Sequence, residues 1–175
     1  MILGLDVSTS ITGVTVLDKN GKIIYNLAID TRKYKNIFKK AEVVRDELKV
    51  LIIDPKYIYI EQSLQSFRSG FSSAKTLSTL SRFNGIVSWI CYETWDIQPE
   101  YIAAISARKQ VGITVPRGQK AKKCVIKYII DNVPDVSIEY TKHGNPKPQC
   151  FDMADSWVIA KAGWIQCQKM KKSSS

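Results

Sequence analysis

The chain has 175 residues, of which 45% are apolar, and a formal net charge of +10. A chain of this length is most simply one domain with a stable core, and its apolar fraction excludes general disorder. No apolar run approaches the roughly 20 residues that cross a bilayer, and we expect no signal peptide. The positive charge favours a polyanionic partner, because Lys and Arg release counterions when they neutralise phosphates.

The four cysteines are far apart and form no CxxC pair, which argues against a zinc knuckle and against a dense disulfide framework. A reducing intracellular compartment is the simplest setting for such a chain. The cysteines are Cys91, Cys124, Cys150 and Cys167.

The first 28 residues predict three antiparallel strands. An apolar strand, a tight turn and a second strand occupy residues 1–17, and Asp-Lys-Asn-Gly at 18–21 is typical of a hairpin turn before a third strand at 22–28. Apolar residues at helical spacing then predict an amphipathic helix over residues 33–52. We interpret the cations of its leading loop and polar face as a solvated surface. They are Arg32, Lys33, Lys35, Lys39 and Lys40.

The rest of the chain alternates strands and helices. The long helix is apolar on more than one face, so we expect it to be buried or to pair with a second copy in a homodimer. Ser106 is expected to cap a short helix, and residues 169–175 to form a flexible basic and Ser-rich tail. The predicted elements are a strand at 57–61, the long helix at 74–94, a strand at 97–104, and helices at 120–132 and 151–168.

Four carboxylates lie at the ends of predicted strands or at the start of a predicted helix. Asp6 and Glu61 each end an apolar strand, and Asp152 and Asp155 are three residues apart at the start of the last helix. Asp6 alone fits either a cap for the turn at Ser8 or a metal ligand. For Asp152 alone, a favourable interaction with the helix dipole is the simpler explanation.

The order of elements predicts an α/β fold, a five-stranded mixed sheet with helices on both faces. If the first and fourth strands are neighbours, Asp6 and Glu61 meet at one edge of the sheet. The last helix, packed alongside, would add Asp152 and Asp155. Two Mg²⁺ ions would relieve the repulsion and could hydrolyse a phosphodiester.

Three segments together resemble the RuvC family of Holliday junction resolvases, which have an RNase H-like fold. They are Ile-Leu-Gly-Leu-Asp6-Val-Ser-Thr-Ser-Ile-Thr-Gly13, Tyr-Ile-Glu61-Gln62, and Asp152-Met-Ala-Asp155-Ser-Trp-Val-Ile-Ala. The resemblance spans residues 2 to about 165, and residues 1–168 would form one nuclease domain. It implies a homodimeric endonuclease that uses two Mg²⁺ ions, or Mn²⁺ in their place, on four-way DNA junctions in a bacterial or phage-infected cytoplasm.

The resemblance also assigns residues. Asp6, Glu61, Asp152 and Asp155 match the metal-binding acids, and a lysine of the basic segment 117–123 matches a catalytic position, with Lys123 preferred over Lys122 and Lys120. Phe67, or else Phe71, matches an aromatic that stacks on a junction base. The expected DNA-binding residues are Phe67, Arg68, Phe71, Arg117, Lys120 and Lys122.

Three other functions compete with junction resolution. Sugar kinases and actin-like ATPases open with a similar strand and Asp, but 175 residues are too few for their two domains. A non-cleaving junction-binding module has no use for four acids. A nuclease of the same fold could instead act on flaps, forks or RNA–DNA hybrids, because the fold does not specify the substrate.

Overall fold

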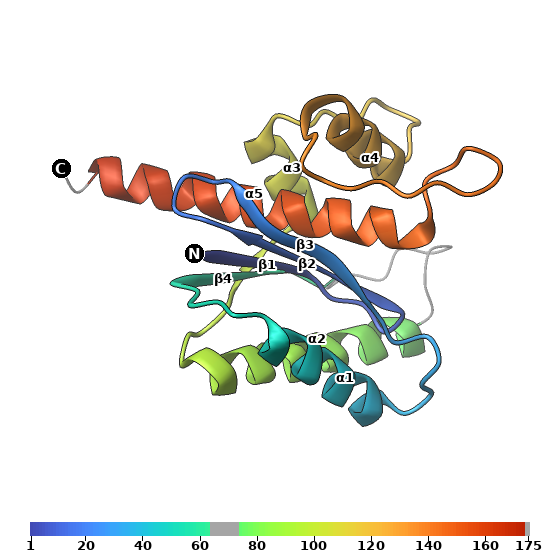
Figure 1. Ribbon diagram of the computed structural model, residues 1–175, viewed down its shortest axis with the longest axis vertical. Coiled ribbons are helices and arrows are strands. Elements are labelled where there is room, and N and C mark those ends of the chain that lie inside the picture. The colour runs from blue at the N-terminus through green and yellow to red at the C-terminus, as the bar shows by residue number, and fades with distance from the viewer. Residues whose placement is uncertain (64–73, 174–175) are drawn as a thin grey trace.

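The computed structural model describes residues 1–63 and 74–173. Within them the chain forms a mixed sheet and a set of helices (Figure 1). The strands are β1 (Ile2–Asp6), β2 (Ile11–Leu17), β3 (Ile23–Asp30), β4 (Tyr57–Glu61) and β5 (Glu100–Ile102). The helices are α1 (Ile37–Val50), α2 (Ala74–Trp95), α3 (Ala104–Val111), α4 (Ala121–Asn132) and α5 (Pro148–Ser173).

The sheet has the strand order β3-β2-β1-β4-β5. β1, β2 and β3 are antiparallel neighbours, whereas β4 runs parallel to β1 and β5 runs parallel to β4. The hairpin between β2 and β3 is closed by Asp18, whose carboxylate accepts from the backbone N–H groups of Asn20 and Lys22. The predicted meander and the pairing of the first and fourth strands are both confirmed.

Helices cover both faces of the sheet. α1 and α2 lie on one face, and α5 crosses the other, with α3 and α4 on its outer side (Figure 1). Strand alternation decides which side chains enter which core: Leu3 and Leu5 pack towards α1 and α2, whereas Ile2 and Tyr59 pack towards α5. The expected α/β fold is therefore confirmed.

Glycines let α5 lie close to the sheet. A Cβ on Gly4 would lie 2.5 Å from the backbone nitrogen of Ala160, and one on Gly13 would lie 1.9 Å from the carbonyl oxygen of Asp152. Gly163 of α5 similarly makes room for the Tyr59 ring. The missing side chains thus bring the start of α5, and the acids that it carries, directly over β1 and β2.

We expect Gly13→Ala to destabilise the protein and reduce its activity. The added methyl group would meet backbone rather than a flexible side chain, and forced overpacking typically costs ~1–3 kcal/mol. Gly85→Ala is the matched control, because nothing lies within 4 Å of its Cβ position on α2 and alanine is the better helix former by about 1 kcal/mol. Urea denaturation should order the proteins as Gly85→Ala, wild type, Gly13→Ala; equal stability of the two variants would contradict this packing.

Several predicted boundaries were wrong. α5 begins at Pro148 rather than residue 151, because proline suits the first turn of a helix, and it continues to Ser173, so residues 169–173 are helical. β5 is confined to Glu100–Ile102. Ser106 does not cap α3: the helix begins earlier, with Ala103 at its N-cap position and no side-chain cap. No helix in the described ranges is long and apolar enough to cross a bilayer.

Candidate active site

The carboxylates of β1 and β4 meet at one edge of the sheet. The parallel pairing places Leu5 beside Ile60, so the next residues, Asp6 and Glu61, end adjacent strands. Both follow the alternation of Ile2 and Tyr59 and therefore face α5. The predicted meeting of these two acids is borne out by the register.

α5 supplies the other two acids, and a polar seam fixes its start against the sheet. The hydroxyl groups of Thr15 on β2 and Ser156 on α5 are hydrogen-bonded at 2.8 Å, and both residues are fully buried. The Asn26 side-chain amide on β3 donates to Thr15 Oγ1 at 2.7 Å and to the Met153 carbonyl at 3.1 Å. Since Asp152 and Asp155 flank Met153, the seam holds both acids over the edge where β1 and β4 end.

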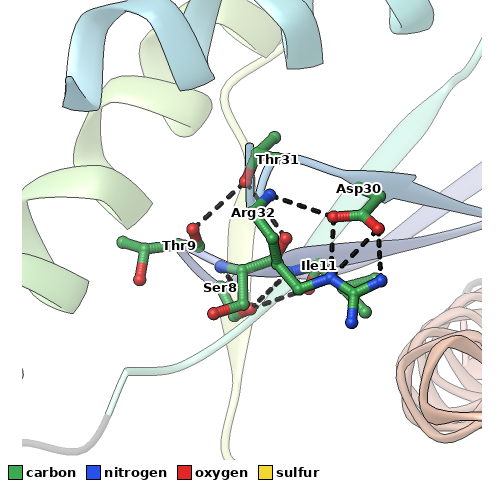
Figure 2. Close-up of polar contacts among 7 residues, drawn as sticks. Ser8, Thr9, Ile11, Asp30, Thr31 and Arg32 are labelled. Atoms are coloured by element: carbon green, nitrogen blue, oxygen red, sulfur yellow. Dashed lines mark hydrogen bonds and ion pairs between the residues drawn. The ribbon is translucent and has the colours of Figure 1, made fainter. Parts of the chain in front are cut away.

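The competing explanations for these acids fail on geometry. Ser8, not Asp6, closes the turn after β1: its hydroxyl donates to the Ile11 carbonyl and accepts from the N–H groups of Ser10 and Ile11 (Figure 2). Because α5 begins at Pro148, its first turn carries no acid, and the dipole interaction fades beyond that turn. Neither a turn cap nor the helix dipole therefore accounts for the acids.

The electrostatics show four acids that repel one another. Burial, then the charges of Glu61 and Asp155, hold the pKa of Asp6 well above its usual value. Burial and the charge of Asp155 raise the pKa of Glu61 to about 7, and burial raises that of Asp155 to about 6. Burial also raises the pKa of Asp152, against the opposing charge of Lys122. Burial, and repulsion between neighbouring acids, thus disfavour the ionised form of these side chains.

Lys122 is the lysine that the fold brings to these acids. Its Nζ lies 3.3 Å from Asp152 Oδ1 and 3.7 Å from Asp155 Oδ2, while 60% of the side chain stays exposed. Lys123, the preferred candidate from the sequence, instead lines a separate hollow of about 380 Å³ with Tyr128 and Asp131. Lys120 precedes α4 at its N-cap, and Arg117 is exposed in the loop before it.

Arg108 of α3 is a site residue that sequence reasoning missed. Its positive charge acts against the raised pKa values of Glu61 and Asp155. No motif marks it, but it follows β5, the strand next to β4, and the turn from β5 into α3 brings it back towards Glu61.

A cleft of about 170 Å³ opens beside Asp6 and Glu61 and is walled by Leu77, Leu80 and Asn84 of α2. The Asn84 side chain donates to the Glu61 carbonyl at 3.0 Å, which ties α2 to the end of β4. The predicted DNA-contacting residues Phe67, Arg68 and Phe71 lie outside the described residues.

The donor set fits a hard divalent cation. All four side chains offer carboxylate oxygens, the ligands that Mg²⁺ prefers, and their mutual repulsion leaves negative charge for a cation to offset. Across residues 1–63 and 74–173, however, no three His, Cys, Asp or Glu side chains are gathered closely enough to hold a metal ion as they stand. The Lys122 ammonium lies between Asp152 and Asp155, so metal binding requires it and the carboxylates to rearrange.

The strand order, with helices on both faces, is that of the RNase H-like fold of RuvC-like resolvases. Among solved structures, the chain is similar to Thermus thermophilus RuvC in complex with a Holliday junction substrate (13% identity, TM-score 0.66, 96% of this chain and 94% of that chain covered). It is also similar to Thermus thermophilus RuvC (15% identity, TM-score 0.62, 97% of this chain and 96% of that chain covered). A third similar structure is Ydc2, the yeast mitochondrial Holliday junction resolvase (16% identity, TM-score 0.61, 98% of this chain and 80% of that chain covered). No family model and no curated protein matches the sequence. The resemblance found in the motifs is thus confirmed at the level of the fold.

Proposed function

We propose that this protein is a divalent-metal-dependent endonuclease that makes paired cuts in a four-way DNA junction near its branch point. The observation that carries the proposal is the meeting of Asp6, Glu61, Asp152 and Asp155 at one sheet edge, on the fold of RuvC-like resolvases. The net charge of +10 supports a nucleic-acid partner, because the acids alone would repel DNA. The four free thiols suit a reducing intracellular compartment.

The chemistry that we assign to this site is hydrolysis of a phosphodiester. Two Mg²⁺ ions, or Mn²⁺ in their place, held by the four carboxylates would supply charge neutralisation and activation of the attacking water. Lys122 would turn from Asp152 and Asp155 towards the scissile phosphate and offset its growing negative charge. Arg108, whose charge acts on Glu61 and Asp155, would offer its guanidinium to a phosphate of the bound DNA.

Paired cuts need two active sites, and α2 supports a homodimer. Its outer face exposes Trp89 and Tyr92, which are 61% and 42% accessible and whose ring centroids lie 5.7 Å apart. Exposed aromatic residues of this kind are enriched at protein interfaces. A second copy that covers this face would place two sites on one junction.

The deciding experiment compares nicking of a synthetic four-way junction, a flap, a fork, a duplex and an RNA–DNA hybrid, each with Mg²⁺ and with EDTA. We expect paired nicks in the junction, and only with Mg²⁺ or Mn²⁺. Preferential cutting of the hybrid, the flap or the fork would show that this nucleic acid, and not the four-way junction, is the substrate. Cutting in EDTA would overturn the metal-dependent mechanism.

We expect Lys122→Met to slow junction cleavage roughly 10²- to 10³-fold, the usual cost of losing one electrostatic contact to a transition state. Its ammonium contacts two of the acids. Lys123→Met is the control, since it removes the same charge one residue away and should change the rate only a few-fold. Single-turnover cleavage with saturating protein separates the rate from affinity, and a larger loss in Lys123→Met would return the role to Lys123.

A further inference from the structure

The segment that follows β3 lies at the same sheet edge as the acids. β3 runs antiparallel to β2, which runs antiparallel to β1, so β3 and β1 end at the same side. Asp6 pairs with Gly13 and Gly13 with Ala28, which puts Ala28 on the face of Asp6; Asp30, two residues further along β3, shares that face. Arg32, two residues beyond Asp30, therefore follows the end of β3 on the side of the sheet where β1 ends.

Hydrogen bonds join this segment to the turn that carries Asp6. Thr31 is fully buried, and its hydroxyl lies 3.1 Å from the Thr9 carbonyl and 3.2 Å from the Ser10 carbonyl, donating to them (Figure 2). The Thr31 N–H also donates to Ser10 at 2.9 Å, and Lys40 Nζ contacts the Thr9 carbonyl. Thr31, next to Arg32, is thus tied to the backbone three and four residues beyond Asp6.

Asp30 orients the Arg32 side chain. Arg32 Nε lies 3.0 Å from both Asp30 oxygens, and Nη2 donates to Oδ2, so the Nε–Nη2 edge of the guanidinium faces the carboxylate (Figure 2). The side chain remains 56% exposed, and within the described residues Nη1 has no hydrogen-bond partner. Its charge slightly opposes the raised pKa of Asp152, so Arg32 lies within electrostatic reach of that acid.

Two ion pairs along α1 differ from the Arg32–Asp30 pair. Lys39 pairs with Glu42, and Arg45 pairs with Asp46, both along the helix that covers the opposite face of the sheet. The Lys39 pair fits the solvated surface expected from the sequence. Arg32 does not, because its acidic partner holds it on the face that carries the active site.

We propose that Arg32 is a phosphate-binding residue that grips the substrate strand two or three nucleotides from the scissile phosphate. β3 and β1 are two strand spacings apart, roughly 10 Å, and successive phosphates of one strand rise about 3.4 Å along the duplex axis. When the duplex axis runs along this sheet edge, the strand held at the acids therefore reaches Arg32 after two or three nucleotides. The inference rests on the proposed function, since it takes DNA as the substrate.

The first test measures four-way junction binding without metal, in EDTA, as a function of salt. Loss of one phosphate contact should reduce the slope of log K against log salt by about 0.9 and weaken binding roughly three- to tenfold at 0.1 M salt. We expect this for Arg32→Gln and no such change for Arg45→Gln, which removes the same charge from the opposite face. Equal slopes for the two variants would overturn the contact.

The second test locates the contact with junctions that carry one neutral methylphosphonate. Wild-type affinity should fall when the neutral linkage lies two or three nucleotides from the cut, on one side, and Arg32→Gln should be indifferent to it there. If the neutral linkage weakened binding by the same factor in Arg32→Gln as in the wild-type protein at all of these positions, the contact would be overturned and the nuclease proposal would remain intact. Failure of the wild-type protein to bind any four-way junction would overturn both.

Discussion

Replacing either strand-end acid by its amide is expected to abolish junction cleavage and to preserve junction binding. Asp6→Asn and Glu61→Gln keep the size of the side chain and remove the charge that a divalent cation would need. Both residues lie where the paired strands β1 and β4 end, and the charge of Asp155 raises the pKa of each. We expect the cleavage rate to fall by at least ~10³-fold, because a two-metal site that loses a ligand loses its main transition-state stabilisation.

Junction binding should not fall together with the cleavage rate. Each carboxylate repels DNA phosphates, so its removal should leave the metal-free affinity unchanged or tighten it by a few-fold. Asp131→Asn is the control: this acid pairs with Lys127 on the outer side of α4, away from the site. It should cut at the wild-type rate. Normal cleavage by Asp6→Asn or Glu61→Gln would show that the metal-binding acids lie elsewhere.

The sheet and the meeting of the acids were predictable because they depend on local rules. Alternation of side chains along β1 and β4 places Asp6 and Glu61 on the same face, and a three-strand meander leaves β1 free to pair with β4. The glycines at 4 and 13 are visible in the sequence. What they permit, the approach of α5, depends on residues about 140–156 positions away.

The choice of lysine shows where sequence reasoning stops. Successive residues of a helix differ by about 100° in direction, so Lys122 and Lys123 point to different sides of α4. Which of them meets Asp152 depends on how α4 packs against α5, and spacing cannot reveal that. Arg32 and Arg108 were missed for the same reason, since strand order rather than any motif brings them to the acids.

We expect the metal-free protein to be more stable near pH 5 than near pH 8. The folded-state pKa of Glu61 is about 7, above its ordinary value of 4.5, and that of Asp155 is about 6, above 3.8. The folded protein therefore binds more protons than the unfolded chain in this range, and the free energy of unfolding falls as the pH rises through these values. Burial and the charge of Asp155 cause the raised pKa of Glu61, so the loss of stability follows the ionisation of this buried side chain.

Urea denaturation in EDTA at pH 5 and pH 8 measures this loss, and Glu61→Gln provides the comparison because it removes one of the titrating groups. That variant should lose less stability between the two pH values, and Mg²⁺ should restore wild-type stability at pH 8, since a cation favours the ionised acids. Asp30 acts in the opposite sense, but its pKa is lowered to about 2 by Arg32, so its effect is confined to pH values below about 4. Stability that rises from pH 5 to pH 8 in both proteins would show that the four acids do not form one buried, mutually repelling cluster.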